Sequence, residues 1–280
     1  MLTALHQESL REHLWRLLLD WPPLLNLPAA TQAMATILNA SRTTPQQAQT
    51  ALITASEDII LGMDARRWLT QCCDPDALHD WSQRGTTLVA HLVQALYRNN
   101  ITTLGATPPL RTVEALDLGF LETALGGADA AAFVAAPTWQ GACCETTLYT
   151  RYQNQPLLIE LSKQYENGIL TRLAAILIAI ATATDALTAP TPPAAGQILC
   201  PAPGIALAAV AAARGILVHR VVMERGLVRD YHILAPTEWN FHPQGVAARG
   251  LATLAPSAHQ QPWARLYLTA LDPCVDFQLA

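Results

Sequence analysis

The chain has 280 residues, of which 51% are hydrophobic and 14% charged, and its formal net charge is −5. This apolar content is enough to bury a substantial core, and it excludes a disordered chain, in which apolar content is low and charge is high. Charges of one sign form no blocks, so the composition also argues against a nucleic-acid-binding protein, which needs a basic surface.

Export and membrane insertion are not indicated by the sequence. Residues 1–20 carry Glu, His and Arg among their leucines, which is not typical of a signal peptide. The most apolar stretch, residues 173–184, is shorter than the roughly 20 residues that span a bilayer, and it predicts a buried helix. We therefore expect a cytoplasmic protein without a membrane span, whose cysteines are reduced. The cysteines form no C-x-x-C pair, so a structural zinc site is not expected.

The N-terminal part of the chain has the spacing of apolar residues that is typical of helices. Leu10, Leu14 and Leu18 recur at helical intervals, and Pro22 with Pro23 is expected to end this first helix. Three further helices are predicted over residues 29–40, 45–61 and 77–97.

The middle of the chain carries a weaker pattern and then a strong one. Residues 100–142 are rich in Gly, Pro and Ala and predict loops with short elements. A long helix is expected over residues 156–187, interrupted at Gly168, and a proline-rich connector follows it. This connector divides a mostly helical part, residues 1–187, from a C-terminal part, residues 194–280, and we expect both to share one compact domain.

The C-terminal part changes to an extended pattern. Residues 216–223 and 227–234 are rich in β-branched and apolar side chains, and Gly226 supplies a turn between them, so they predict a β-hairpin. A short helix is expected over residues 262–271, close to the end of the chain. The predicted fold class is therefore mainly α with a small β-hairpin or sheet element.

Four short segments within residues 137–277 resemble the nickel–iron hydrogenase large subunit family. In that family the segments E-T-G-P-L-A-R, A-P-R-G, P-S/T-x-W-N and D-P-C-x-x-C occur in this order, with a hairpin after the second. Here the matching segments are E-T-T-L-Y-T-R at residues 145–151, Ala213-Arg214-Gly215, P-T-E-W-N at residues 236–240, and Asp272-Pro273-Cys274. Four matches in order make the resemblance specific, and it implies a degenerate fold of the large-subunit type. The first 136 residues match only through their helix content.

The sequence departs from the family at the nickel ligands. Family members hold nickel with four cysteines from two C-x-x-C pairs, but the N-terminal pair is missing here, and Phe277 stands at the last cysteine position. Cys274 is the one thiol of the four that remains, and a single thiolate does not hold nickel with useful affinity. The resemblance therefore implies a protein that binds no nickel and is not an enzyme.

The residues around the family's iron are better preserved than the nickel ligands. In the family, iron carries two cyanides and one carbon monoxide, and the Arg of A-P-R-G and the Ser or Thr of P-S/T-x-W-N donate hydrogen bonds to the cyanides. By resemblance, Arg214, Pro236 and Thr237 would bind this Fe(CN)2CO unit, and Cys274 would supply a thiolate to the iron. A guanidinium forms charge-assisted hydrogen bonds with an anionic cyanide, and a thiolate is a metal ligand, so the chemistry is sound.

Each of these residues also has a plainer interpretation. Arg214 is suited to cap a helix and pair with an acid, Thr237 to lie in a turn, and Cys274 to be a remnant without a function. Cys143 and Cys144 stand directly before the E-T-T segment and are an alternative source of a thiolate for iron.

The resemblance implies one function and leaves one alternative. Relatives of the large subunit that have lost the nickel ligands, of the HupK/HoxV type, are regarded as hydrogenase maturation proteins. We therefore expect a maturation scaffold that receives or transfers a transient Fe(CN)2CO unit, with other maturation proteins and the hydrogenase large subunit as partners. The alternative is a protein-binding chaperone that mimics the large subunit without carrying a cofactor.

Overall fold

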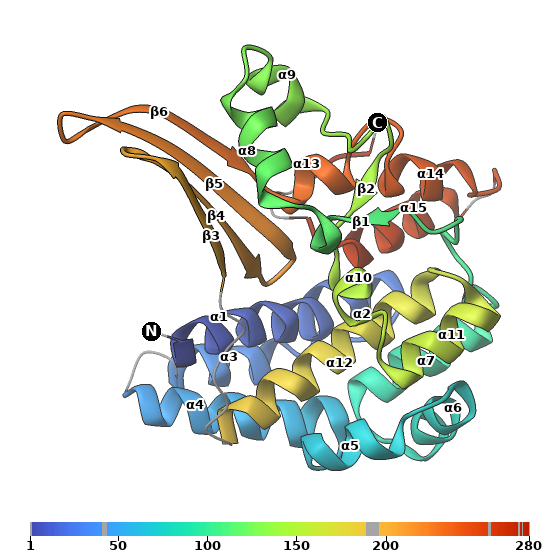
Figure 1. Cartoon of the computed structure of the whole chain (residues 1–280). Coiled ribbons are helices and arrows are strands. Elements are labelled where there is room, and N and C mark those ends of the chain that lie inside the picture. The colour runs from blue at the N-terminus through green and yellow to red at the C-terminus, as the bar shows by residue number, and fades with distance from the viewer. Residues whose placement is uncertain are drawn as a thin grey trace.

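The computed structural model describes residues 2–40, 44–188, 196–256, 259–273, 275 and 277–279. Figure 1 shows a body of long helices that includes the N-terminus, with a curved four-stranded sheet and a group of shorter elements on one side of it. The described part of the chain is thus mainly helical with small sheets, which is the coarse fold class that the sequence predicts.

The helical body and the second group of elements are defined as follows. The helices of the body are α1 Leu2–Trp15, α2 Trp21–Leu24, α3 Thr31–Ala40, α4 Pro45–Thr54, α5 Ala65–Gln71, α6 Pro75–Arg84, α7 Leu88–Arg98, α11 Pro156–Tyr165 and α12 Ile169–Thr188, with π-helical segments at Arg16–Asp20 and Ala55–Leu61. The second group contains β1 Arg111–Thr112, α8 Leu118–Gly126, α9 Ala130–Ala135, β2 Cys144–Glu145, α10 Leu148–Tyr152, β3 Gln197–Ala202, β4 Ile205–Ala212, β5 Gly215–Glu224, β6 Leu227–Leu234, α13 Pro236–Asn240, α14 Val246–Ala252 and α15 Gln260–Ala270.

Helix α12 lies at the centre of the helical body and is buried on all sides. Among the described helices it is the one long and apolar enough to cross a membrane by length and composition, but 78% of its most apolar window is buried inside the protein. Its apolar side chains share one core with α1, α5, α7 and α11, and Leu266 and Ala270 of α15 belong to the same core. The prediction of a buried helix is confirmed, and this core joins the C-terminal helix to the N-terminal ones.

One predicted helix end agrees with the structure, and one predicted helix is in fact two. Helical structure runs without a break from α1 through the π-helical segment Arg16–Asp20 into α2 and ends at Leu24, one residue after Pro23. The helix expected over residues 77–97 is two helices, α6 and α7. The second of these begins at Thr87, whose side chain accepts a hydrogen bond from the backbone N–H of Ala90.

The other helical predictions agree with the structure. The interruption at Gly168 is confirmed, since α11 ends at Tyr165 and α12 begins at Ile169. A Cβ at Gly168 would lie 2.8 Å from the Cα of Thr103, so the close approach of the two segments requires a glycine. The proline-rich connector falls outside the described residues, apart from Thr188.

The predicted hairpin is the second half of a four-stranded antiparallel sheet with the strand order β3-β4-β5-β6. Strands β5 and β6 form the hairpin, and Gly226 has a φ of +80° at its turn. One face of the sheet packs on α8 and α9, and its core side chains are Leu207, Val218 and Leu234. The sheet is therefore anchored to the rest of the protein through this face.

Candidate functional site

The segments that resemble the hydrogenase large subunit meet at the junction of the sheet and the helical body. The side chain of Asn240 bridges to the E-T-T segment, accepting a hydrogen bond from the N–H of Thr146 at 2.9 Å and donating one to its carbonyl at 2.7 Å. The Thr146 hydroxyl in turn accepts a hydrogen bond from the N–H of Ile216 at 2.9 Å and donates one to Glu114 at 2.8 Å. Four separate segments of the chain are thus tied together by buried and partly buried hydrogen bonds.

Gly215 shows how closely these segments approach. Its φ is +149°, and a Cβ there would lie 2.6 Å from the carbonyl oxygen of Thr146 and 2.9 Å from the Cβ of Pro236. Arg151, the last residue of the E-T-T-L-Y-T-R segment, donates hydrogen bonds to the carbonyls of Ala212 and Gly215. The two ends of the hairpin therefore lie side by side, as the sequence predicts, and the residues on either side of Arg214 are held in place.

A buried ion pair fixes the E-T-T segment to the central helix. Nη1 of Arg172 donates a hydrogen bond to Oε1 of Glu145 at 2.7 Å, and both side chains are 1% exposed. The hydroxyl of Thr147 donates a second hydrogen bond to the same carboxylate at 2.7 Å. The Arg172 guanidinium also lies over the rings of Tyr149 and Tyr267, which stabilises its charge away from water.

Arg214 belongs to a cluster of four charged side chains, Glu12, Arg16, Arg214 and Asp272, which we call the Arg214 cluster. Arg214 contacts Oε2 of Glu12 at 2.7 Å and Oδ1 of Asp272 at 3.2 Å. Arg16 contacts the same Asp272 oxygen at 2.6 Å and donates a hydrogen bond to the carbonyl of Pro273 at 2.9 Å. The acid pairing that the sequence left open for Arg214 is thus present, and one of its partners precedes Cys274 by two residues.

Two hollows adjoin Arg214. A small cavity of about 10 Å³ lies between Arg172, Arg214 and Asp272, and an open groove of about 270 Å³, which we call the α1 groove, is lined by Arg11, Glu12, Trp15, Arg16 and Arg214. The family resemblance predicts a mostly apolar pocket here, with Pro236 on its wall. The α1 groove is instead charged, because α1 and the residue after it contribute the side chains of Arg11, Glu12 and Arg16. Pro236 lines neither hollow and is buried beside Gly215.

The other residues that the resemblance assigns to the iron site are Cys274 and Thr237. Cys274 lies outside the described residues, and its neighbour Pro273 is held by Arg16. Thr237 is the second residue of α13 and is half-buried. Its contact with an iron ligand stays a prediction, as do those of Arg214 and Pro236.

Cys144 belongs to a second core, beneath the sheet, and its neighbour Cys143 is also buried. The Sγ of Cys143 lies 3.1 Å from Nδ1 of His242, and both side chains are buried. Burial raises the pKa of the Cys144 thiol to about 11, so this thiol is neutral at physiological pH. Within the described ranges, His, Cys, Asp and Glu side chains form no group of three that is arranged to hold a metal ion.

His13 is a member of the site that the sequence did not reveal. It is 2% exposed on α1, and its Nδ1 has no hydrogen-bond partner among the described residues. Burial lowers the pKa of His13 from 6.5 to about 4, while Asp272 acts in the opposite direction, and the charges of Arg151, Arg214 and Arg16 lower it further. His13 is therefore neutral in the folded protein over most of the pH range in which a free histidine becomes protonated.

The free energy of unfolding should fall as pH decreases from about 6.5 to about 4. The unfolded chain takes up a proton at His13 in this window and the folded chain does not, so protonation favours unfolding by up to about 3 kcal/mol. Urea unfolding at a series of pH values measures this slope. The slope should be smaller in His13→Gln, which does not titrate.

Glu12 is a neighbour whose protonation has the opposite effect on stability. Its pKa is raised by burial, so its protonation favours the folded state as pH falls and partly offsets the effect of His13. Both proteins in the comparison keep Glu12, and the difference between their slopes therefore reports His13 alone. Equal slopes in the two proteins would contradict a buried neutral His13.

Comparison with known proteins places the chain in a family. It is 29% identical over 298 residues to the hydrogenase expression/formation protein HoxV of Cupriavidus necator, a match that covers 98% of this chain and 75% of that relative. It is 30% identical over 284 residues to HupK of Azotobacter vinelandii, also a hydrogenase expression/formation protein, covering 97% of this chain and 73% of HupK. No family model matches the chain.

Both relatives are proteins of hydrogenase expression and formation, and they define the class to which this mainly helical chain belongs. The chain belongs to the HupK/HoxV family of hydrogenase expression/formation proteins. A third relative, HupV of Azotobacter chroococcum, is 32% identical over 179 residues, which are 63% of this chain and 47% of HupV.

Proposed function

We propose that this protein acts in the formation of a nickel–iron hydrogenase by receiving or transferring the Fe(CN)2CO unit at the α1 groove. The observation that carries the proposal is the position of Arg16 and Arg214. Both line the groove, both contact Asp272, and Arg16 also binds the carbonyl of Pro273. The groove thus adjoins the residue that directly precedes Cys274, the thiol that the family resemblance assigns to iron.

The chemistry of the groove suits an anionic iron unit as cargo. Guanidinium groups donate charge-assisted hydrogen bonds, and the nitrogen ends of metal-bound cyanides are acceptors. The groove has three guanidiniums, from Arg11, Arg16 and Arg214, and Trp15 supplies an apolar surface beside them. The cavity of about 10 Å³ behind Arg214 has room for about one water molecule, so it is the groove that offers space for the unit.

An accessory role without catalysis is consistent with Phe277 at the position of the last nickel-binding cysteine. A protein that passes on the iron unit needs a thiolate and hydrogen-bond donors, but not the cysteine set that holds nickel. We propose other hydrogenase maturation proteins and the hydrogenase large subunit as its partners, and the cytoplasm as its location. The names of the relatives support this role, since each is called an expression/formation protein.

Replacing Arg214 with leucine should weaken the retention of the Fe(CN)2CO unit by about tenfold or more, because a hydrogen bond to a charged group contributes about 1.5–3 kcal/mol. It should also shift the cyanide stretching bands in the infrared spectrum of the protein purified without air. Arg249→Leu is the matched control, since Arg249 lies in α14 and lines neither hollow. An Arg214→Leu protein with the iron content and the spectrum of the control would count against the groove.

One observation favours the protein-binding chaperone as a second candidate. Ile198, Tyr231 and Ile233 point to the sheet face opposite α8 and α9 and are 72%, 51% and 44% exposed. Apolar side chains gathered on an exposed face are typical of protein–protein contact sites. A chaperone of this kind would bind its partner through the sheet while carrying no iron, so the iron content of the protein distinguishes the two functions.

A further inference from the structure

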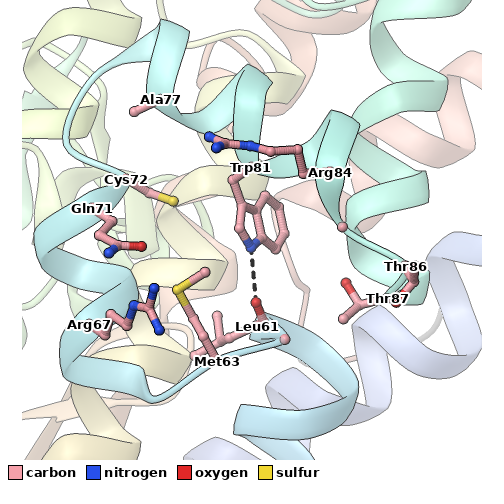
Figure 2. Close-up of a pocket in the computed structure, with 12 residues that line it drawn as sticks. Leu61, Met63, Arg67, Gln71, Cys72, Ala77, Trp81, Arg84, Thr86 and Thr87 are labelled. Carbon is pink, nitrogen blue, oxygen red and sulfur yellow. Dashed lines mark hydrogen bonds between the residues drawn. The ribbon is translucent and has the colours of Figure 1, made fainter.

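A pocket of about 370 Å³ lies in the helical body, and it shares no lining residue with the α1 groove. It is formed where the π-helical segment Ala55–Leu61 ends and where α5, α6 and the start of α7 come together (Figure 2). Gly62 makes the turn that shapes its edge, with a φ of +68°. A volume of this size is within the range of ligand-binding pockets in proteins.

The floor of the pocket is apolar. Figure 2 shows Trp81 at its centre, with the side chains of Met63 and Cys72 beside the indole ring. Trp81 Nε1 already donates a hydrogen bond to the carbonyl of Leu61 at 2.9 Å, so the ring offers an occupant only its apolar surface. Burial raises the pKa of the Cys72 thiol to about 12, and this thiol therefore lines the pocket as a neutral group.

The rim of the pocket is positively charged. Arg67 on α5 and Arg84 on α6 lie on opposite sides of it in Figure 2, and both are exposed. Arg67 has no acidic partner among the described residues. Arg84 contacts Asp80 at 3.6 Å, and both of those side chains are exposed, so the pair is weak. Two guanidiniums thus flank an apolar floor in a chain whose net charge is −5.

We propose that this pocket binds an acidic peptide segment of a partner protein, with one apolar side chain on the Trp81 floor and flanking carboxylates at Arg67 and Arg84. An apolar side chain that enters the pocket packs against Met63 and Trp81, and carboxylates form charge-assisted hydrogen bonds with guanidiniums. The pocket is partly open to solvent and both arginines are exposed, which allows a chain to pass over it while one side chain enters. This proposal does not depend on the iron cargo.

Three acetylated and amidated pentapeptides test the proposal by isothermal titration with the whole protein. The first is alanine–aspartate–phenylalanine–aspartate–alanine, the second has asparagine in place of both aspartates, and the third has alanine in place of phenylalanine. We expect the first peptide to bind, and the other two to bind about tenfold more weakly or not at all. Failure of the first peptide to bind, or equal binding of the first two, would overturn the proposal.

A pair of neighbouring arginines supplies a matched control for the site. Arg66 and Arg67 are both exposed on α5, but Arg66 contacts Asp185 at 3.0 Å and does not line the pocket. Arg67→Ala should weaken binding of the first peptide about tenfold, and Arg66→Ala should leave it unchanged. Both residues are exposed, so both variants are expected to fold, which circular dichroism verifies. Equal effects of the two substitutions would mean that the peptide responds to overall charge, and the pocket assignment would be wrong.

Discussion

Replacing Arg172 with methionine should lower the free energy of unfolding by about 3–5 kcal/mol, because it leaves the carboxylate of Glu145 buried without its partner. Both side chains of this pair are 1% exposed, so water cannot replace the lost hydrogen bond. The same substitution should loosen the E-T-T segment, whose only charged anchor to α12 among the described residues is this pair. Urea unfolding followed by circular dichroism measures the loss.

Two further variants separate the buried charge from the loss of the arginine itself. The double variant Glu145→Gln with Arg172→Met carries no buried charge at this position and should recover a large part of the lost stability. Arg66→Met breaks the exposed pair with Asp185 and should cost about 1 kcal/mol or less. An Arg172→Met protein as stable as the Arg66→Met protein would contradict a buried, structurally required ion pair.

Replacing Cys274 with alanine should abolish bound iron while the protein stays folded. The resemblance to the large subunit makes Cys274 the thiolate ligand, and hydrogen bonds from arginines alone do not hold an iron atom. Metal analysis of protein purified without air from hydrogenase-producing cells measures the loss. Cys73→Ala is the control, because Cys73 is an exposed cysteine that lies between α5 and α6 and lines neither of the hollows at Arg214.

If the Cys274→Ala protein retains iron, a different thiol must be the iron ligand. Cys143 and Cys144 are then the candidates, and Cys143 has His242 at 3.1 Å as a second donor. Such a result would contradict the α1 groove as the binding place, since neither cysteine lines that groove.

The helical body could be predicted from the sequence because its signals are local. The apolar residues of α1, α3 and α4 recur every three to four residues, whereas α12 is apolar almost throughout, and the packing of these helices follows from both patterns. The division between α6 and α7 was missed because Leu88, Leu92 and Leu96 continue the apolar pattern of α6. The signal that was present is Gly85 followed by Thr87, a helix end and an N-cap.

The first two strands of the sheet could not be predicted by the same means. Strand β4, Ile205–Ala212, contains five alanines, and alanine is the residue that most favours helices. It is extended because it pairs with β5 along its whole length, from Ile205 opposite Val222 to Ala212 opposite Gly215. That pairing is a tertiary contact, and it overrides the local preference.

The candidate site also contains residues that the sequence predicts and residues that it does not. Arg214, Pro236, Thr237 and Cys274 could be chosen from the sequence because they stand in segments that resemble a known family. Glu12, His13 and Arg16 could not, since the first 136 residues carry no such segment and only the folded chain brings α1 against Asp272. For that reason the charged groove next to Arg214 could be found only in the structure and could not be predicted from the sequence.

Infrared spectroscopy tests the central claim most directly, on protein purified without air from cells that are assembling a nickel–iron hydrogenase. Metal-bound cyanide and carbon monoxide absorb in a region where proteins are otherwise transparent, so the spectrum reports the Fe(CN)2CO unit itself. A carrier protein should show cyanide and carbonyl bands together with bound iron, and should lose them in Cys274→Ala. Folded protein from the same cells without iron and without these bands would contradict the carrier function and leave the protein-binding chaperone as the better account.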